Sequence, residues 1–380
     1  MTCWKPTPHL SARLGRTRRS QRRQAWIAQA LLCFTIVGCA SIGPRTVPRD
    51  RTDYITAVAE SWKEQTLLNV VRMRYGDAPS FVDVSSVISA YTFQGQISAN
   101  GQISTDRTTA VPSGLANLGG TTSYSDRPTI TYTPLAGDRF SSSLLRPIPP
   151  SAIFELIQAG FPADVILQIT TRGINGLSNR SSLGGGTRAA DPDFYAVLAA
   201  LRRLQLSGEV SLRIQKREAE ELGLLIFSSG RTEESRRDLD FVLKKLRVKP
   251  GKGGQINLVF GALARSDDEI AVLSRSMLGV LLEVGTGIAV PGTDITDGRA
   301  MASGRPAEAS DPHDRPLVSI YSGAAQPPVS YASVHYRDTW YWIPDNDFAS
   351  KRVFTFLMLF FSLAETGVTP QPPLVTIPAN

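Results

Sequence analysis

The chain has 380 residues, and its apolar fraction of 42% is typical of a folded globular protein rather than of one with many membrane spans. The formal net charge is +7, which would suit a nucleic-acid-binding protein. However, seven of the 41 basic residues lie within residues 1–38, which contain no acidic residue, so the remaining 34 basic residues equal the 34 acidic ones. The rest of the chain therefore lacks the overall positive charge that attracts nucleic-acid phosphates.

Residues 1–38 have the composition of an export signal. A basic stretch extends to residue 24, and an apolar stretch follows over residues 25–37, interrupted only by Gln29 and Thr35. Such a stretch is too short for a bilayer, which requires about 20 residues, but it matches the apolar region of a signal peptide. We therefore expect residues 1–38 to form a signal peptide that is removed during export.

The apolar stretch ends in Ile36-Val37-Gly38-Cys39, which resembles the lipobox of bacterial lipoproteins. In that family Leu is the usual residue where Ile36 stands here. The resemblance implies cleavage before Cys39 and acylation of Cys39, for example with palmitate, so that buried acyl chains anchor the protein to a membrane. Ala40 in place of an aspartate implies sorting to the outer membrane, with the chain facing the periplasm.

The cysteine count agrees with this compartment. The three cysteines are Cys3, Cys33 and Cys39, and the first two lie in the export signal. An acylated Cys39 would leave no free thiol and no disulfide in the mature chain, as suits an oxidising compartment. Thiolate metal sites and cysteine catalysis are thereby excluded.

Residues 39–52 contain Pro44 and Pro48 and are expected to form a tether. A helix is expected over residues 53–75, because apolar residues recur there with helical spacing and Gly76 to Pro79 would end it. Trp62 is expected to pack in the core. With the segment that follows, the helix forms a predicted region of residues 53–134, a helix plus a long hairpin.

Residues 87–103 alternate with a period of two, which is typical of a strand with two different faces. One face is mostly apolar, and the other is polar without charge. A second run over residues 121–133 repeats the pattern, and a loop is expected between them, over residues 104–120. The residues expected on the apolar face of this hairpin are Tyr91, Phe93, Ile97, Ile103, Tyr124, Ile130 and Tyr132.

Two interpretations of this hairpin stay open. Alternation over about ten residues is typical of membrane β-strands, and in the first interpretation each subunit contributes one hairpin to a shared barrel. A single hairpin would leave unsatisfied amides in lipid, and oligomerisation would be obligatory. The alternative is a hairpin that packs its apolar face on a soluble domain. Asp126 on the apolar face and Pro128 within the strand both weigh against a membrane strand.

The remainder of the chain alternates helical and strand patterns, which predicts an α+β fold with mixed sheets and packed helices. An α/β core is expected over residues 135–290, including a strand at 165–171 and a helix at 267–284. A loop is expected over residues 291–316. Residues 317–380 should form a C-terminal hairpin, with strands 331–336 and 339–343, and a buried apolar helix over 345–364.

No catalytic or cofactor motif is present. The chain has no nucleophile elbow, Walker loop or dinucleotide fingerprint, so we expect no enzyme activity and no cofactor. His313 lies between Asp311 and Asp314 in a polar segment, where solvated side chains are expected rather than a metal site. Trp340, Tyr341 and Trp342 are expected to pack rather than to bind a ligand.

Trp62 to Gln65 and Pro128 to Pro134 resemble segments of uncharacterised bacterial outer-membrane lipoproteins, a resemblance that implies no activity. The sequence therefore predicts a lipid-anchored, non-catalytic envelope protein that binds an envelope partner or further copies of itself. The alternative is an oligomeric outer-membrane pore or export element, with residues 87–133 in a shared barrel. A hydrolase is disfavoured, since no paired carboxylates can be located.

Overall fold

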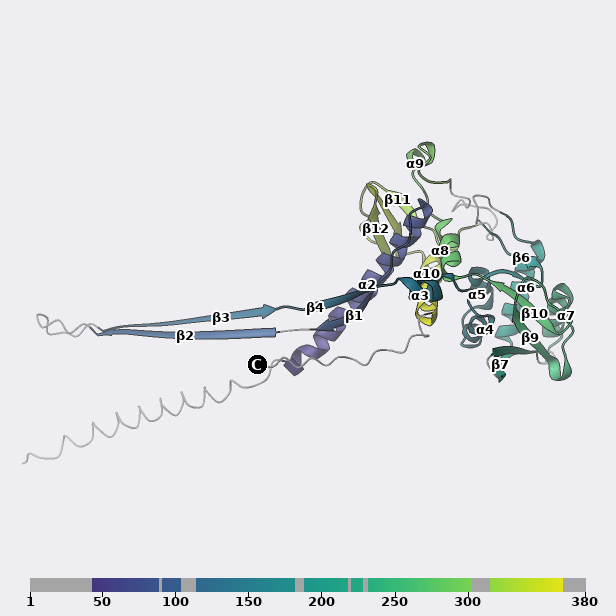
Figure 1. The fold of residues 1–380 in the computed structure, drawn as a ribbon, viewed down its shortest axis with the longest axis horizontal. Coiled ribbons are helices and arrows are strands. Elements are labelled where there is room, and N and C mark those ends of the chain that lie inside the picture. Colours follow the sequence, from purple (N-terminus) through teal and green to yellow (C-terminus); the bar gives the residue numbers. More distant parts are fainter. Residues whose placement is uncertain are drawn as a thin grey trace, which may run out of the picture. The chain divides into compact units, whose positions relative to one another are not determined.

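The computed structural model describes residues 43–88, 91–103, 114–181, 188–217, 220–227, 232–302 and 315–364 (Figure 1). The chain divides into two compact units. The first unit comprises residues 1–57 and 89–127, and the second comprises residues 58–88 and 128–380. The export signal, Cys39 and His313 lie outside the described residues.

The first long helix, α2, extends over Gly43–Arg74 and ends before a turn at Tyr75 and Gly76. It begins ten residues before the predicted start, so the expectation of a tether is wrong for residues 43–52. Pro44 lies in the first turn, where helix amides have no partner within the helix, so its missing N–H is tolerated there. Pro48 removes one further bond without ending the helix.

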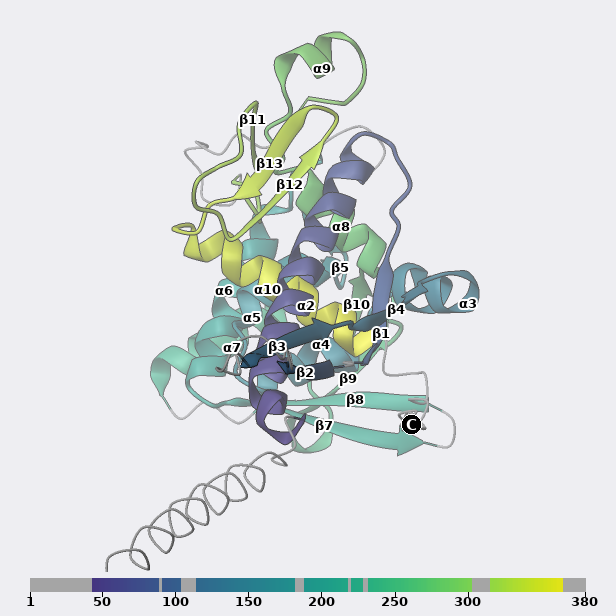
Figure 2. The same ribbon diagram turned by 90° about the vertical axis from the view of Figure 1, so that its left-hand side faces the viewer.

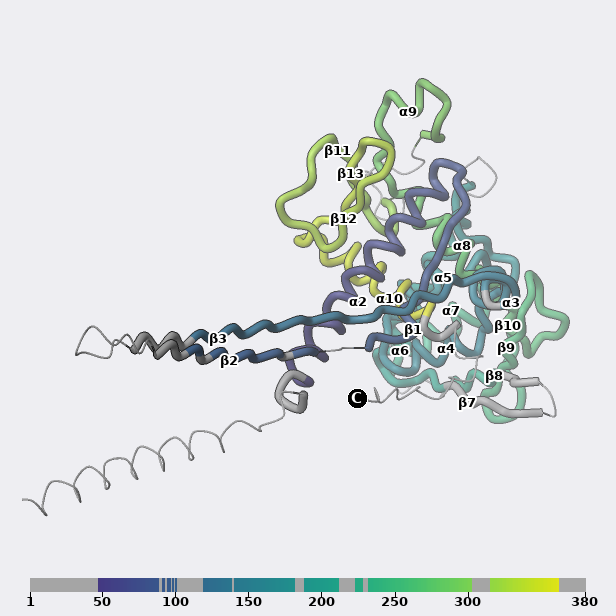
Figure 3. The backbone as a smooth tube through the Cα atoms, turned by 60° about the vertical axis from the view of Figure 1, so that its left-hand side comes forward, coloured from purple at the N-terminus to yellow at the C-terminus, as the bar shows by residue number. Residues whose placement is uncertain are grey.

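In the first unit, β2 (Tyr91–Ile103) pairs antiparallel with β3 (Gly114–Asp126), and the two strands run side by side in Figure 3. The two strands pair in the antiparallel sense that the hairpin prediction requires, and β3 begins seven residues earlier than expected. The expectation of a loop is therefore wrong for residues 114–120. Gly, Ala, Leu and Asn in this segment gave a weak strand signal, and pairing with β2 overrides it.

In the second unit, β1 (Val82–Ile88) pairs antiparallel with β4 (Thr129–Pro134). The run predicted over residues 121–133 is thus divided between two strand pairs. Pro128 lies between β3 and β4 rather than inside a strand, so its missing N–H interrupts no ladder.

A six-stranded sheet forms the centre of the second unit, with the order β6-β5-β10-β9-β8-β7. Its strands are β5 (Thr171–Ile174), β6 (Leu177–Ser178), β7 (Val210–Arg217), β8 (Glu220–Phe227), β9 (Gln255–Phe260) and β10 (Glu269–Ser274). Only β9 and β10 are parallel to each other; the other neighbours are antiparallel. The mixed sheet agrees with the predicted fold class.

In the described part of the second unit, five helices lie around this sheet. They are α4 (Pro150–Gln158), α5 (Ala163–Thr170), α6 (Pro192–Leu206), α7 (Glu233–Leu246) and α8 (Met277–Gly285), with short turns at α3 (Gly137–Phe140), η1 (Ser141–Leu145) and η2 (Lys252–Gly254). Helix α6 packs between α5 and α7. Thr232 caps α7, its side chain accepting a hydrogen bond from the amide of Ser235 at 3.1 Å.

Two predicted elements in this region are wrong. The strand expected at residues 165–171 is helix α5, because a short apolar run does not distinguish a buried helix from a strand. The helix expected at 267–284 is strand β10 followed by helix α8. Ile270 to Val272 pair with β9, and a new helix begins after the Ser276 cap.

The C-terminal part contains a three-stranded sheet with the order β11-β13-β12, whose strands lie side by side in Figure 2. The strands are β11 (Tyr321–Gly323), β12 (Ala332–Tyr336) and β13 (Thr339–Ile343). The predicted hairpin is confirmed. Within the loop predicted at 291–316, residues Gly292–Thr296 form the short helix α9. The predicted final helix is α10, Phe348–Ala364.

The core of the second unit draws on α2, the helices around the sheet, and α10. Its largest fully buried side chains include Tyr341, Phe194, Phe354, Leu67, Leu144 and Ile153. Arg275 and Glu283 are also buried, with 3.6 Å between Arg275 Nη2 and Glu283 Oε2. Arg275 donates to the carbonyls of Gln168, Ile169 and Arg180, which satisfies much of its donor capacity. The fold is α+β, as predicted.

No helix among the described residues is long and apolar enough to cross a membrane.

Candidate assembly surface

The pairing of β2 with β3, called here the long strand pair, divides its backbone positions between two different faces. Residues directly opposite one another in a sheet share a face. The register opposes Phe93 to Tyr124 and Ile97 to Gly120, which gathers the apolar positions on one face. The other face receives Gln94 with Ser123, and Gln96 with Thr121. The separation of faces predicted for each strand alone therefore holds across the pair.

Aromatic rings mark one end of the long strand pair. The rings of Tyr91 and Tyr124 stack with centroids 6.2 Å apart and planes 19° apart. Tyr124 is 55% exposed. A hydrogen bond with Tyr124, followed by Asp50, raises the pKa of Arg49 on α2. Asp126, which lies opposite Tyr91, is the last residue of β3, so the charge on the apolar face stands at its very end.

The outer edges of the long strand pair carry few of the features that protect edge strands. Among the described residues, no strand pairs with the second edge of β2 or of β3. Natural edge strands are usually blunted by Lys, Pro, inward charges or short length. β2 and β3 have 13 residues each, with no proline, no basic residue and only Asp126 as an acid. Two long, uncharged edges are therefore open to pairing.

The pairing of β1 with β4, the short strand pair, contains a β-bulge at Ser85. Val84 pairs with Tyr132, whereas Ser86 pairs with the neighbouring Thr131, which leaves Ser85 as the extra residue. The Ser85 hydroxyl donates to the Thr131 carbonyl at 3.1 Å. As a result, Val82, Val84 and Val87 share one face with Pro134, Tyr132 and Ile130. Tyr132 is 60% exposed, so this apolar face is incompletely covered within the second unit.

Two amide side chains of α2 hold the start of β1. Asn69 donates to the Ser80 carbonyl and accepts from the Ser80 amide, both at 2.8 Å. Gln65 donates to the Val82 carbonyl at 3.0 Å and accepts from its amide at 2.6 Å. Residues four apart share a helix face, and residues two apart share a strand edge, so the two spacings match. The amides thus replace a neighbouring strand at Ser80 and Val82.

This arrangement brings together the two segments Trp62 to Gln65 and Pro128 to Pro134. Gln65, from the segment Trp62 to Gln65, binds Val82, and Val82 pairs with Pro134 of the other segment. A groove of about 260 Å³ lies beside these contacts. Its walls include Trp62, Phe81 and Phe361. Trp62 is partly buried against the core, as predicted.

A polar network fixes the C-terminal end of α2 to the C-terminal sheet. The Tyr75 hydroxyl donates to Asp294 Oδ2 at 2.5 Å and lies 2.5 Å from the Tyr341 hydroxyl. Burial, followed by the hydrogen bond to Asp294, raises the pKa of Tyr75. Arg299 Nη1 lies 3.2 Å from Asp294 Oδ1, so the buried carboxylate has both a neutral donor and a charged one. These contacts give the network a structural role, which is to hold the turn after α2 against α9 and β13.

A second contact links the turn after α2 to the β12–β13 hairpin. Asp77 accepts hydrogen bonds from the Tyr336 hydroxyl and from Arg337 Nη2, the latter at 2.9 Å. The Tyr336 hydrogen bond, with help from Arg337, lowers the pKa of Asp77. The Arg337 guanidinium also lies over the Tyr75 ring, 5.2 Å from its centroid. Arg337 and Asp338 have positive φ angles of 47° and 62°, which fits a two-residue hairpin turn.

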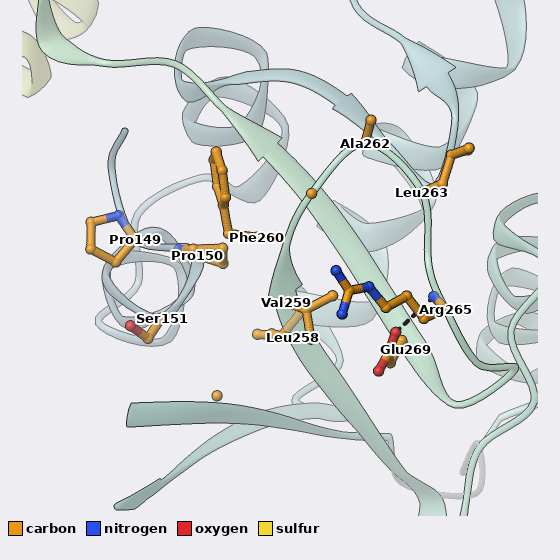
Figure 4. A pocket seen from close by; sticks show the side chains of 12 residues that line it. Pro149, Pro150, Ser151, Leu258, Val259, Phe260, Ala262, Leu263, Arg265 and Glu269 are labelled. Carbon is orange, nitrogen blue, oxygen red and sulfur yellow. Dashed lines mark hydrogen bonds between the residues drawn. The ribbon is translucent and has the colours of Figure 1, made fainter. Parts of the chain in front are cut away.

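The second unit also contains a larger hollow of about 690 Å³ beside β9 and the first turn of α4 (Figure 4). Pro149, Pro150 and Phe260 form one side of it, and Arg265 and Glu269 lie at the other. Glu269 accepts a hydrogen bond from the backbone amide of Arg265 at 2.8 Å. Most of the lining residues are apolar or glycine, and the polar side chains among them are Ser151, Arg265 and Glu269.

The remaining predicted site residues are placed as follows. Tyr91 lies in β2 and Tyr124 in β3, whereas Ile130 and Tyr132 lie in β4 and pair with β1. The backbones of Phe93, Ile97 and Ile103 lie in β2, and their side chains are outside the described structure. Cys39 and His313 lie outside the described residues altogether. Tyr341 is fully buried, as the packing interpretation of Trp340 to Trp342 requires.

His335 lies on β12, exposed beside the Trp340 ring with centroids 5.2 Å apart. In the described part of the chain, no group of three or more His, Cys, Asp or Glu side chains is arranged to hold a metal ion.

Comparison with known proteins adds no family or relative. No protein-family model, no curated protein and no solved structure matches the chain.

Replacing Asn69 with alanine is expected to release the start of β1. Both polar groups of Ser80 would lose their partner, and Asn69 is fully buried, so the free energy of unfolding should fall by about 1–3 kcal/mol. Urea denaturation measures the loss, and hydrogen exchange should show faster exchange at Ser80 but not in β9. The half-buried Asn257, bonded to Asp268, provides the control variant Asn257→Ala. Equal losses in the two variants would contradict the role of Asn69.

The Asp77 contact should make stability depend on acid pH. The folded pKa of Asp77 is lowered, so its contribution is present above the unfolded value of about 4 and disappears as the pH falls below that value towards the folded pKa. Asp77→Asn removes this contribution, so its melting temperature should change less than that of the wild type between about pH 4 and pH 2. Thermal melts measure both profiles. Asp345→Asn, at an exposed ion pair with Lys351, is the control and should retain the wild-type slope.

Proposed function

We propose that this chain is a lipid-anchored protein of the bacterial cell envelope. Acylated Cys39 holds it at the periplasmic side of the outer membrane, and it acts as a non-catalytic assembly component. The proposal rests on the lipobox resemblance for the anchor and on the strand pairs for the assembly role.

One observation carries the assembly role: among the described strands, none pairs with the outer edges of the long strand pair, whose only charged residue is the terminal Asp126. A two-stranded sheet is marginally stable in water, and stable sheets have three or more strands or a covering helix. Long, flat edges without lysine or proline also invite association with other chains. A protein that retains such edges gains stability when another chain pairs with them, which is the behaviour of an assembly component.

The anchor supports the same role by restricting where pairing takes place. Acyl chains confine the protein to a membrane surface, where each buried CH₂ contributes about 0.8 kcal/mol and several chains make a durable attachment. Confinement raises the local concentration of copies and partners, as a tether does. Open strand edges are then most useful at that surface rather than free in the periplasm.

The anchor is tested by Cys39→Ser in the full chain. Wild-type protein should incorporate a radiolabelled or clickable palmitate and fractionate with outer membranes, whereas the variant should incorporate none and lose membrane association. Ser41→Ala, two residues away, should behave as the wild type. Label in the Cys39→Ser protein, or wild-type protein in the cytosol with residues 1–38 retained, would contradict the anchored location.

A second candidate function is an oligomeric outer-membrane pore or export element, with one hairpin from each chain in a shared barrel. The favouring observation is the register, which puts Phe93 with Tyr124 and Ala99 with Leu118 on a face without a basic residue. Thirteen residues extend about 44 Å at ~3.4 Å per residue. At a tilt of about 40°, the strands would rise about 34 Å, more than the ~25 Å apolar band of outer-membrane barrels.

Vesicle leakage tests the pore candidate. The full chain should release a small encapsulated dye, whereas a variant with residues 91–126 replaced by an Asn-Gly turn should not. The replacement retains β1 and β4, and its circular dichroism and membrane association serve as controls for folding. Equal release by the two proteins, or none by either, would exclude the pore while leaving the anchored assembly component in place.

A further inference from the structure

The polar face of the long strand pair consists of side chains of a uniform chemical kind. On β2, the side chains of Thr92, Gln94, Gln96, Ser98 and Asn100 are all exposed. Their partners on β3 include Ser125, Ser123, Thr121 and Gly119. Every one of these residues is small, a hydroxyl or an amide, and none is ionisable at neutral pH. The face therefore presents hydrogen-bond donors and acceptors to water, without a charge of either sign.

The open edges indicate which chain extends this face. One edge of the pair belongs to β2 and the other to β3, and the two strands run antiparallel. The β2 edge of one copy therefore fits the β3 edge of the next in an antiparallel pairing, and the same contact repeats around a ring. Such a head-to-tail contact produces a closed ring when its rotation closes. Further copies of this chain, one on each side, are consequently sufficient to satisfy both edges.

Pairing between copies also preserves the two faces. Because side chains alternate with a period of two, an in-phase register places polar faces next to polar faces, whereas a slip by one residue mixes them. A mixed register would place Gln and Asn amides of one copy on the same side of the sheet as Tyr91 and Tyr124 of the next. The closed sheet thus keeps the polar positions from Thr92 to Asn100 on one side and the mostly apolar positions on the other.

We propose that this polar face lines a water-filled passage that admits small hydrophilic solutes without selecting them by charge. The proposal rests on the pore function above and specifies its substrate class. Charge-selective pores use rings of Asp and Glu for cations or of Arg and Lys for anions. The described positions of this lining supply none, and their amides and hydroxyls hydrate cations and anions alike. Size, rather than charge, then limits passage.

The test is single-channel recording in planar bilayers with the full-length, lipidated protein. Under a tenfold KCl gradient, the wild-type reversal potential should correspond to a permeability ratio of K⁺ to Cl⁻ within about twofold of the ratio in free solution. Neutral sugars of increasing size, added to partition into the pore, should lower its conductance until they become too large to enter.

Two adjacent positions provide matched variants. Gln96 lies opposite Thr121 on the polar face, and Ile97 lies opposite Gly120 on the other face. Gln96→Lys should retain conductance and acquire anion preference, and Gln96→Glu should acquire cation preference. Ile97→Lys places the same charge towards lipid, where Lys is strongly disfavoured, and should abolish conductance. Retained expression and palmitate labelling of Ile97→Lys show that the anchored protein is still produced.

The outcomes separate this inference from the proposals on which it depends. Conductance with strong cation or anion preference in the wild type would overturn the uncharged lining but leave the pore in place. Selectivity that responds to Ile97→Lys and not to Gln96→Lys would assign the lining to the other face and also overturn the inference. Absence of conductance in a palmitate-labelled, membrane-bound protein would overturn both the lining and the pore, but not the anchored assembly component.

Discussion

The short strand pair depends at its start on the four hydrogen bonds that Gln65 and Asn69 make with Val82 and Ser80. A strand pair with open edges has little to define where it begins, because its register is weakly specified without a neighbour. Here a rigid helix supplies that neighbour through side chains alone. The Leu135 amide donates to the Phe81 carbonyl at 2.9 Å from the other side, so three consecutive residues, ending with the first residue of β1, are held. The alternation of faces in β1 is thereby set at its first residue.

The second unit holds this clamp, the four hydrogen bonds of Gln65 and Asn69, on a well-packed helix. α2 carries Leu67, Val70 and Val71 into the core, and its C-terminal end is bound to the C-terminal sheet through Tyr75 and Asp77. The same helix thus presents amides to the strand, apolar side chains to the core and a tyrosine to a buried carboxylate. An exposed strand pair contributes little stability of its own. The position of the short strand pair is therefore fixed by its hydrogen bonds to α2, which is well packed.

Much of this architecture follows from sequence patterns, and the exceptions have identifiable causes. Period-two alternation predicted the two strands that pair as β2 and β3. The C-terminal hairpin around Arg337-Asp338 and the buried helix α10 are confirmed. The strand expected at 165–171 and the helix expected at 267–284 were wrong, because tertiary pairing and packing decide short apolar runs. The start of β3 at Gly114 was missed, since Gly and Ala give little strand signal without a partner. The clamp was also missed, although two amides four residues apart before a strand are a recognisable cue.

The bulge at Ser85 has a further consequence for how this chain tolerates changes in length. In a regular strand, gaining or losing a single residue inverts the side on which everything beyond it emerges. β1 already contains one surplus residue and absorbs it locally, so that Val82, Val84 and Val87 stay in step. A chain one residue shorter at this point would simply revert to unbroken pairing with the same valines together. β2 and β3 pair without any such interruption. Inserting or deleting one residue in either strand would therefore move the positions beyond it to the opposite face.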